Sequence, residues 1–315
     1  MNGITSVLGI KYPIIQGGMG NISNAALTAA VSEAGGLGTI GAGTMSADEV
    51  EQIILETKTR TQKPFSVNIA LSVSPNAVEI LKLAVKHGVK IVTLSAGNPA
   101  PFIPKLKEAG IKIITVVASV KQAKKAEAAG ADVLVAEGFE AAGINSNLET
   151  TTLALIPQIV AQVNIPVVAA GGIGDGKGLA SMLALGASGV QMGTRFIATK
   201  EAPFHEVYKQ KLLQANDYET VIVGRSVGKI RRLLNTSYAG KLLEAEKQGI
   251  TPEEFAELTT EDIHKKGALE GNEEKGFMNG GQVSGLISDI PTVQELLDRM
   301  VTEAKERLKI SGALL

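Results

Sequence analysis

The sequence of 315 residues contains no cysteine and no tryptophan, and aromatic residues make up only 3% of it. Without cysteine there is no disulfide framework, no thiolate metal site and no cysteine nucleophile, so no metal site is predicted. The scarcity of aromatic rings and a formal net charge of -1 leave neither a basic surface nor a platform for stacking bases. We therefore expect a protein that does not bind nucleic acid and that works in a reducing compartment.

Long apolar runs are also missing. No run reaches the length of a membrane-spanning helix, and the amino-terminal stretch MNGITSVLGIKYPIIQ lacks the cationic segment and long apolar core of a secretion signal. We therefore expect a cytoplasmic protein with no membrane association. The chain is instead rich in hydrophobic residues, at 44%, and in glycine, with 35 residues. This composition is typical of a globular protein with a large core.

Short apolar runs alternate with helical segments from Pro13 to Phe196. Several of the helical segments end in glycine directly before an apolar run, as at Gly110 and Gly130, a pattern typical of a helix cap that leads into a strand. The predicted strands begin near Pro13, Leu37, Pro64, Ile91, Lys112, Val133, Val167 and Val190. Eight such units favour a closed (β/α)8 barrel, the TIM barrel of the α/β class, over an open doubly wound sheet.

The stretch from Val167 to Phe196 contains the most informative glycines. Two apolar runs end there, one at Gly171-Gly172 and the other at Gly193-Thr194. Parallel neighbouring strands place their carboxyl ends on one face, where glycine lets backbone NH groups approach an anion. In barrels of this class, the loops after strands seven and eight commonly hold a phosphate. The sequence therefore predicts a phosphate-binding cradle at these two loops.

Two other glycine motifs are excluded by their context. Gly36 to Gly41 has the letters of a dinucleotide-binding fingerprint, but a helix precedes it and a strand occupies it, which reverses the required order. Gly171 to Gly178 is close to a phosphate-binding loop of nucleotide hydrolases, but Gly178 follows Lys177 where a hydroxyl side chain is needed for magnesium. Neither a Rossmann domain nor a nucleotide hydrolase is predicted.

After Phe196 the pattern changes to charged helices. We expect a barrel formed by residues 1–199 and 280–315, and a helical lid or substrate-side subdomain, inserted after strand eight, at residues 200–279. We refer to residues 200–279 as the insertion. Its predicted helices, and the helix that closes the barrel, are Phe204–Leu213, Leu242–Lys247, Pro252–Lys266 and Thr292–Leu308.

The histidines and one basic cluster offer few catalytic candidates. His87 is expected at a helix end away from the site, and His205 and His264 at solvated positions in the insertion. The cluster of Lys229, Arg231 and Arg232 is expected on a solvated helix face. An alternative is that the cluster meets the phosphate of NADPH or an acidic carrier protein.

Several short stretches together resemble one family, the FMN-dependent barrel proteins that comprise bacterial enoyl-acyl-carrier-protein reductase II (FabK) and nitronate monooxygenase, also known as 2-nitropropane dioxygenase-like proteins. The resemblance covers Tyr12 to about Lys211 and resumes at Gly280. Its matching stretches are Gln16–Met19, Ala34–Gly38, Lys63–Asn68, Ser95–Pro99, Ala136–Gly138, Ala169–Ile173 and Gln191–Phe196.

The resemblance implies an FMN cofactor, with NAD(P)H as co-substrate. It places the FMN phosphate at the backbone of Gly171, Gly172, Gly193 and Thr194, and Gly18, Met19, Asn68 and Gln191 near the flavin ring or its ribityl chain. The full set of predicted cofactor-binding residues is Gly18, Met19, Asn68, Glu137, Ala170, Gly171, Gly172, Gln191, Gly193 and Thr194. Structural roles, with Asn68 capping a strand end and Met19 packing in the core, are the alternative.

One departure from the family pattern bears on catalysis. The family has Glu-Ala-Gly-Gly-His after the sixth strand, whereas this chain has Glu140-Ala141-Ala142-Gly143-Ile144. The resemblance assigns that histidine an acid or base role beside the flavin, and isoleucine carries no proton. Asn145 and Ser146 lie next to it but are poor acids, so no catalytic residue is predicted.

The resemblance implies an NAD(P)H-dependent enoyl-thioester reductase of fatty acid biosynthesis, whose substrate is a small molecule or is carried by acyl carrier protein. Nitronate monooxygenation is the second reading, because a nitronate is already deprotonated and needs no base. A flavin-binding protein with lost or altered catalysis is the third. A homodimer is compatible with each of them.

Overall fold

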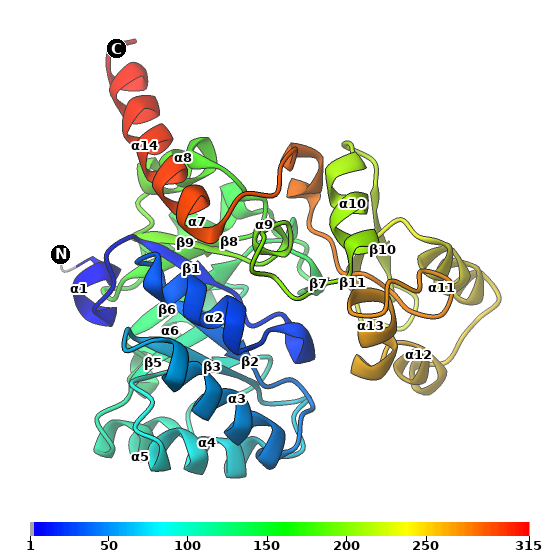
Figure 1. The fold of residues 1–315 in the computed structure, drawn as a ribbon, viewed down its shortest axis with the longest axis horizontal. Coiled ribbons are helices and arrows are strands. Elements are labelled where there is room, and N and C mark those ends of the chain that lie inside the picture. Colours follow the sequence, from blue (N-terminus) through cyan, green and yellow to red (C-terminus); the bar gives the residue numbers. More distant parts are fainter. Residues whose placement is uncertain (1–2, 315) are drawn as a thin grey trace.

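The computed structural model describes residues 3–314, in which eight parallel strands form one sheet in the order β1-β9-β8-β6-β5-β4-β3-β2 (Figure 1). The strands are β1 (Ile14–Gln16), β2 (Gly38–Gly41), β3 (Phe65–Ala70), β4 (Ile91–Ser95), β5 (Lys112–Val117), β6 (Val133–Glu137), β8 (Val167–Ala170) and β9 (Gly189–Met192). The sheet closes between its two ends, because Ile15 bridges Leu37 in parallel and the NH of Gln16 donates to the Leu37 carbonyl at 2.9 Å. The predicted (β/α)8 barrel is confirmed.

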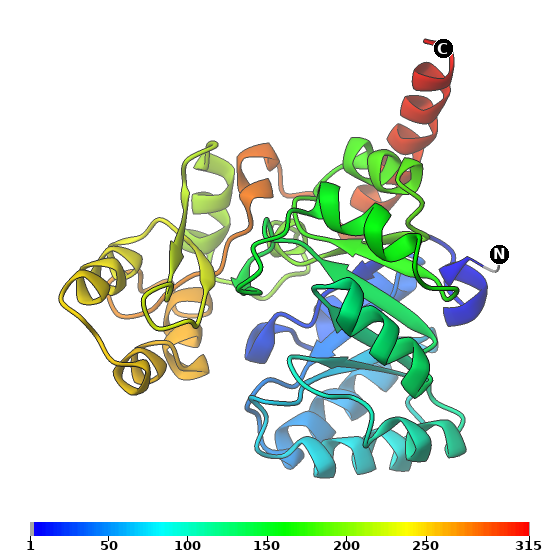
Figure 2. The ribbon, with the colours of Figure 1, turned by 180° about the vertical axis from the view of Figure 1, so that it is seen from behind.

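Helices alternate with the strands and cover the outside of the barrel (Figures 1 and 2). They are α2 (Ala25–Glu33), α3 (Ala47–Arg60), α4 (Ala77–Lys86), α5 (Ile103–Glu108), α6 (Val120–Ala129), α7 (Thr152–Val160), α8 (Gly176–Ala184) and the short α9 (Thr194–Ile197). The amino-terminal α1 (Ile4–Leu8) packs its buried Ile4 and Leu8 into the core cluster that contains Ile91 and Val133, the first residues of their strands. That end of the barrel is therefore filled by side chains.

Local signals fix where several helices begin. The side chain of Asn24 accepts from the NH of Leu27, and Thr292 and Glu295 form a capping box at the start of α14 (Val293–Gly312). Leu296, Leu297 and Met300 are buried along α14, which lies where a closing helix was predicted, and this helix packs against α8. Within residues 3–314, no helix is long and apolar enough to cross a membrane.

The insertion contains strands as well as helices. Its elements are α10 (Glu206–Gln214), β10 (Thr220–Val223), β11 (Arg231–Leu234), α11 (Ser237–Lys247), α12 (Pro252–Leu258) and α13 (Glu261–Ala268), and the short helix η2 (Gln282–Leu286) follows it. The predicted single helix at Pro252–Lys266 was wrong, because Thr260 caps a new helix by accepting from the NH of Ile263. The expectation of a purely helical insertion was also wrong, since the β-branched run Thr220–Val223 pairs with β11.

A strand from the barrel completes the sheet of the insertion. β7 (Gly143–Ile144) lies in the loop after β6 and pairs antiparallel with β11, giving a three-stranded sheet in the order β10-β11-β7. Ile144 lies opposite Arg231, and Gly143 lies opposite Arg232. A separate core that includes Val223, Leu233, Tyr238, Leu242, Phe255 and Phe277 supports this sheet. The insertion is thus a small α/β unit fastened to the carboxyl-end loops of the barrel.

Candidate active site

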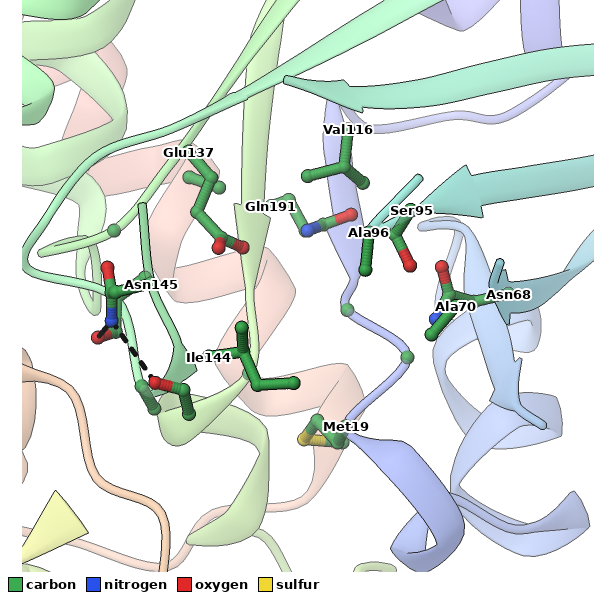
Figure 3. Close-up of a pocket in the computed structure, with 18 of the residues that line it drawn as sticks. Met19, Asn68, Ala70, Ser95, Ala96, Val116, Glu137, Ile144, Asn145 and Gln191 are labelled. Carbon is green, nitrogen blue, oxygen red and sulfur yellow. Dashed lines mark hydrogen bonds between the residues drawn. The ribbon is translucent and has the colours of Figure 1, made fainter. Parts of the chain in front are cut away.

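A cavity of about 1040 Å³ lies at the carboxyl ends of the barrel strands and is bounded on one side by the insertion. Every residue that the sequence predicts to contact a cofactor lines it, namely Gly18, Met19, Asn68, Glu137, Ala170, Gly171, Gly172, Gln191, Gly193 and Thr194. Figure 3 shows the side chains of Met19, Asn68, Glu137 and Gln191 around a common space. The fold therefore brings the whole predicted set together, and their contact with a cofactor stays a prediction.

The loop after β8 has the form of an anion cradle. Gly171 and Gly172 have φ angles of 101° and 72°, which favour glycine, and a Cβ atom at Gly171 would lie 2.9 Å from the carbonyl oxygen of Gly138. Within residues 3–314, the NH group of Gly172 donates to no acceptor. In the loop after the neighbouring strand β9, the Thr194 hydroxyl accepts from the NH of Gly281 at 3.1 Å. A free NH group at Gly172, beside two glycine-rich strand ends, fits the phosphate of FMN.

The loop after β1 forms another part of the cavity wall, next to the loop after β9. A Cβ atom at Gly18 would lie 2.5 Å from the Asn68 side-chain nitrogen, so this loop packs directly on the end of β3. Met19 adopts a left-handed φ of 54°, which is uncommon for a residue other than glycine. Residues with such backbone angles cluster at functional sites. Met19 also packs partly against the core. The side chain thus contributes to packing and lines the cavity at once.

Glu137 is the acidic group at the end of β6. Its side chain points into the cavity (Figure 3) and is partly exposed there. Burial raises the pKa of Glu137 to about 7, and within residues 3–314 its carboxyl has no hydrogen-bond partner that would oppose this shift. Close to neutral pH the carboxyl can therefore either hold a proton or accept a hydrogen bond from a ligand hydroxyl.

Ile144 is the residue at which the resemblance expects a histidine. Its side chain is 47% exposed and points into the cavity (Figure 3). The neighbouring polar residues are used by the loop itself. The Asn145 amide donates to the carbonyl oxygens of Ala141 and Gly143 at 2.9 and 3.3 Å, and the Ser146 hydroxyl accepts from the NH of Leu148. Neither residue is positioned as a substitute acid.

His264 corrects the expectation of a solvated histidine. Its side chain is only 1% exposed and lines the cavity, because α13 packs against the short helix η1 (Gly20–Ile22) at the barrel mouth. Its Nδ1 atom lies 3.3 Å from Glu261 Oε2, and its Nε2 atom lies 3.0 Å from the Asn279 amide nitrogen. His205, by contrast, is exposed at the start of α10, as predicted.

Glu261 connects His264 of the insertion to the barrel. Its carboxylate accepts from the NH of Asn21 at 3.3 Å. Burial opposes ionisation of this carboxyl, but the hydrogen bond and charge of His264, the Asn21 NH and the charge of Arg231 bring the pKa of Glu261 down to about 2. Sequence reasoning missed this group, although the spacing of Glu261 and His264, three residues apart on one helix face, was a signal for it.

The predicted basic cluster does not lie on a solvated helix face. Arg231 and Arg232 belong to β11, and Arg232 is buried, with its guanidinium donating to the Phe139 carbonyl at 3.2 and 3.0 Å. The Lys229 ammonium donates to the Pro252 carbonyl at 3.1 Å. Only Arg231 of these three residues lines the cavity. The prediction failed because the segment forms a strand, which directs alternate side chains to opposite faces.

Comparisons with known proteins agree with this geometry. The family model described as nitronate monooxygenase matches residues 2–80 and 71–303. The structure of FabK from Thermotoga maritima has a TM-score of 0.93 and 41% identity, and covers 100% of both chains. A Rhodococcus jostii protein named (3aS,4S,5R,7aS)-5-hydroxy-7a-methyl-1-oxo-octahydro-1H-indene-4-carboxyl-CoA dehydrogenase is 33% identical over 99% of this chain and 98% of its own length.

A probable nitronate monooxygenase from Staphylococcus saprophyticus is similar to the same degree, with 34% identity over 96% of this chain and 97% of the relative. The family model and these full-length similarities agree with the closed barrel and with the cavity at its carboxyl end. The chain therefore belongs to the nitronate monooxygenase family and is an oxidoreductase of the type that FabK and nitronate monooxygenase represent.

Proposed function

We propose that this protein is an FMN-dependent enoyl-thioester reductase that uses NAD(P)H. The observation that carries the proposal is the 41% identity to FabK over the full length of both chains. The relative from Rhodococcus jostii, which is named for its action on a carboxyl-CoA compound, also favours a thioester substrate. The staphylococcal relatives named as nitronate monooxygenases show that the family name alone does not decide the substrate.

The cavity suits FMN at its glycine-rich end. The backbone of Gly171 and Gly172, with Gly193 and Thr194 in the loop after the neighbouring strand β9, would hold the phosphate. When bound, FMN would supply the hydride chemistry that links a nicotinamide to the β-carbon of an enoyl chain. The cavity volume of about 1040 Å³ lies at the upper end of the range for ligand pockets and leaves room for a substrate beside a cofactor.

Reduction of an enoyl thioester also requires a proton at the α-carbon. Ile144 cannot supply it, whereas Glu137 lines the same cavity and has a pKa raised to about 7 by burial. A general acid is most effective when its pKa is close to the working pH. We therefore assign the proton at neutral pH to the Glu137 carboxyl, in addition to its predicted contact with the cofactor.

Anaerobic stopped-flow spectroscopy tests the proposal. Purified protein should contain FMN, and NADH or NADPH should bleach the flavin absorbance rapidly. Crotonyl-CoA, added next, should restore the absorbance without oxygen. The proposal fails if neither nicotinamide bleaches the flavin, or if the bleached flavin does not react with the enoyl thioester.

Nitronate monooxygenation is the second candidate, and Ile144 is the observation that favours it. A reaction that starts from a nitronate needs no base to remove a proton, so an apolar side chain at this position does not block it. In the same experiment, this function predicts bleaching by propionate 3-nitronate and slow or absent bleaching by nicotinamides. The two candidates therefore give opposite results with the same two reagents.

A further inference from the structure

A second cavity of about 940 Å³ lies between the insertion and the barrel and adjoins the first. The two cavities share a small set of lining residues, namely Val73, Ile144, Asn145, Ser146, Arg231 and Glu261. These shared residues mark the place where the cavities meet. A ligand with a reactive end in the first cavity and a long tail can therefore extend past them into the second.

Arg231 is the cationic residue among those shared by both cavities. Within residues 3–314, its guanidinium has no hydrogen bond and no carboxylate within ion-pair distance. It makes a cation–π contact with Phe277, with its Cζ atom 5.7 Å from the centre of the ring. Burial lowers the pKa of Arg231, and only the more distant charge of Glu261 raises it. The Glu261 carboxylate is already occupied by His264 and by the NH of Asn21.

Neighbouring arginines of the insertion have hydrogen-bond partners. Arg232 donates to the Phe139 carbonyl, and Arg225 forms two hydrogen bonds of 2.9 Å to the carboxylate of Glu149. A partly buried guanidinium without such partners is costly, because it has lost water without gaining a replacement. The difference between Arg231 and its neighbours indicates that a ligand completes its hydrogen bonding.

The strand register gives the direction of this group. Arg231 on β11 lies opposite Ile144 on β7, and residues directly opposite each other in an antiparallel pair place their side chains on the same face of the sheet. Ile144 points into the first cavity (Figure 3). The pairing of β7 with β11 therefore holds Arg231 beside Ile144, at the boundary of the two cavities.

We propose that Arg231 binds a phosphate group in the tail of a long ligand whose reactive end lies in the first cavity. The planar guanidinium can donate two parallel hydrogen bonds to two oxygen atoms of a phosphate, which favours a phosphate over a single neutral oxygen as its ligand. The phosphate has two possible sources, a nicotinamide dinucleotide and the pantetheine arm of an acyl thioester. The identity of the reactive end rests on the function proposed above, whereas the binding of phosphate does not.

The test compares Arg231→Gln with Lys247→Gln in the flavin-loaded protein. Lys247 is an exposed residue of α11 that lines neither cavity, so its variant removes one positive charge from the same insertion as a matched control. Calorimetry measures the Kd for ADP and for CoA without turnover. Arg231→Gln should weaken at least one of them by about 10- to 100-fold, as expected for loss of charged hydrogen bonds, and Lys247→Gln should change neither.

Steady-state kinetics identify the source of the phosphate. A rise in KM for NADH and NADPH points to the dinucleotide, and a rise for crotonyl-CoA but not for the phosphate-free crotonyl-N-acetylcysteamine thioester points to the pantetheine arm. If Arg231→Gln does not fold, Arg231→Lys, which keeps the charge and loses the paired geometry, should give a smaller weakening of the same ligand.

Two results overturn the phosphate site. One is unchanged binding of both ADP and CoA in a folded Arg231 variant, and the other is a KM that rises for propionate 3-nitronate alone. The outcome is separable from that of the proposed function. If binding of ADP or CoA depends on Arg231 but nicotinamides do not reduce the flavin, the phosphate site is supported and the reductase function is refuted. If the protein reduces enoyl thioesters normally and the Arg231 variant has unchanged Kd and KM values, the reductase function is supported and the phosphate site is refuted.

Discussion

Replacing Glu137 with glutamine should make the stability of the flavin-free protein less dependent on pH. Burial raises the pKa of Glu137 from 4.5 to about 7, so the folded chain holds this proton more tightly than the unfolded chain. The contribution to stability is therefore fully present below pH 4.5 and is lost as the pH rises through 7. The gap between 4.5 and about 7 corresponds to about 3 kcal/mol of unfolding free energy, at about 1.4 kcal/mol for each pH unit.

Urea unfolding at pH 5, 6, 7 and 8, followed by circular dichroism, measures this effect. The unfolding free energy of Glu137→Gln should rise relative to that of the unaltered protein by about 2.5 kcal/mol between pH 5 and pH 8, since glutamine has no charge to bury. Glu108→Gln, at an exposed position of α5, is the control and should follow the unaltered protein. Parallel pH curves for Glu137→Gln and the unaltered protein would refute the reasoning.

Three further substitutions test other parts of the site. Gly171→Ala places a Cβ atom 2.9 Å from the Gly138 carbonyl oxygen and forces alanine into a φ of 101°, so the purified protein should lose bound flavin and its melting temperature should fall; an unchanged flavin spectrum would contradict the cradle. Glu261→Gln should destabilise the protein by about 2 kcal/mol at pH 7 in urea unfolding, because it weakens the hydrogen bond to His264. Since the pKa of Glu261 is lowered to about 2, its contribution is present above pH 4.5 and lost as the pH falls through 2, so the two proteins should converge in acid; a constant difference would count against this. Ile144→His should raise the kcat/KM of crotonyl-CoA reduction by about 100-fold if a missing acid limits the rate, and no gain would show that protonation is not limiting.

The barrel could be predicted from the sequence because its signals are local. An apolar run that follows a glycine cap identifies several strands, and β5 and β6 begin at the predicted residues, Lys112 and Val133. The position of Gly171 and Gly193 at the site followed from the same reasoning, since parallel strands bring their carboxyl ends to one face.

The wall of the cavity that the insertion forms could not be predicted in this way. β7 has only two residues, and it exists because β11 pairs with it across a long stretch of chain. His264 and Arg231 lie in polar segments that read as solvated surface, and they face the cavity only because the insertion folds back on the barrel. Such positions depend on tertiary contacts, which neither periodicity nor helix signals report.

The pairing of β7 with β11 has a consequence for exchanging parts between relatives. The sheet of the insertion takes one of its strands from the barrel, and the NH of Asn145 extends the contact by donating to the Ile230 carbonyl at 2.9 Å. A chimera that exchanges only residues 200–279 would pair β10 and β11 of one relative with β7 of the other. A transplant must also carry the segment around Gly143 and Ile144, so the smallest portable unit that keeps this sheet whole is discontinuous in the chain.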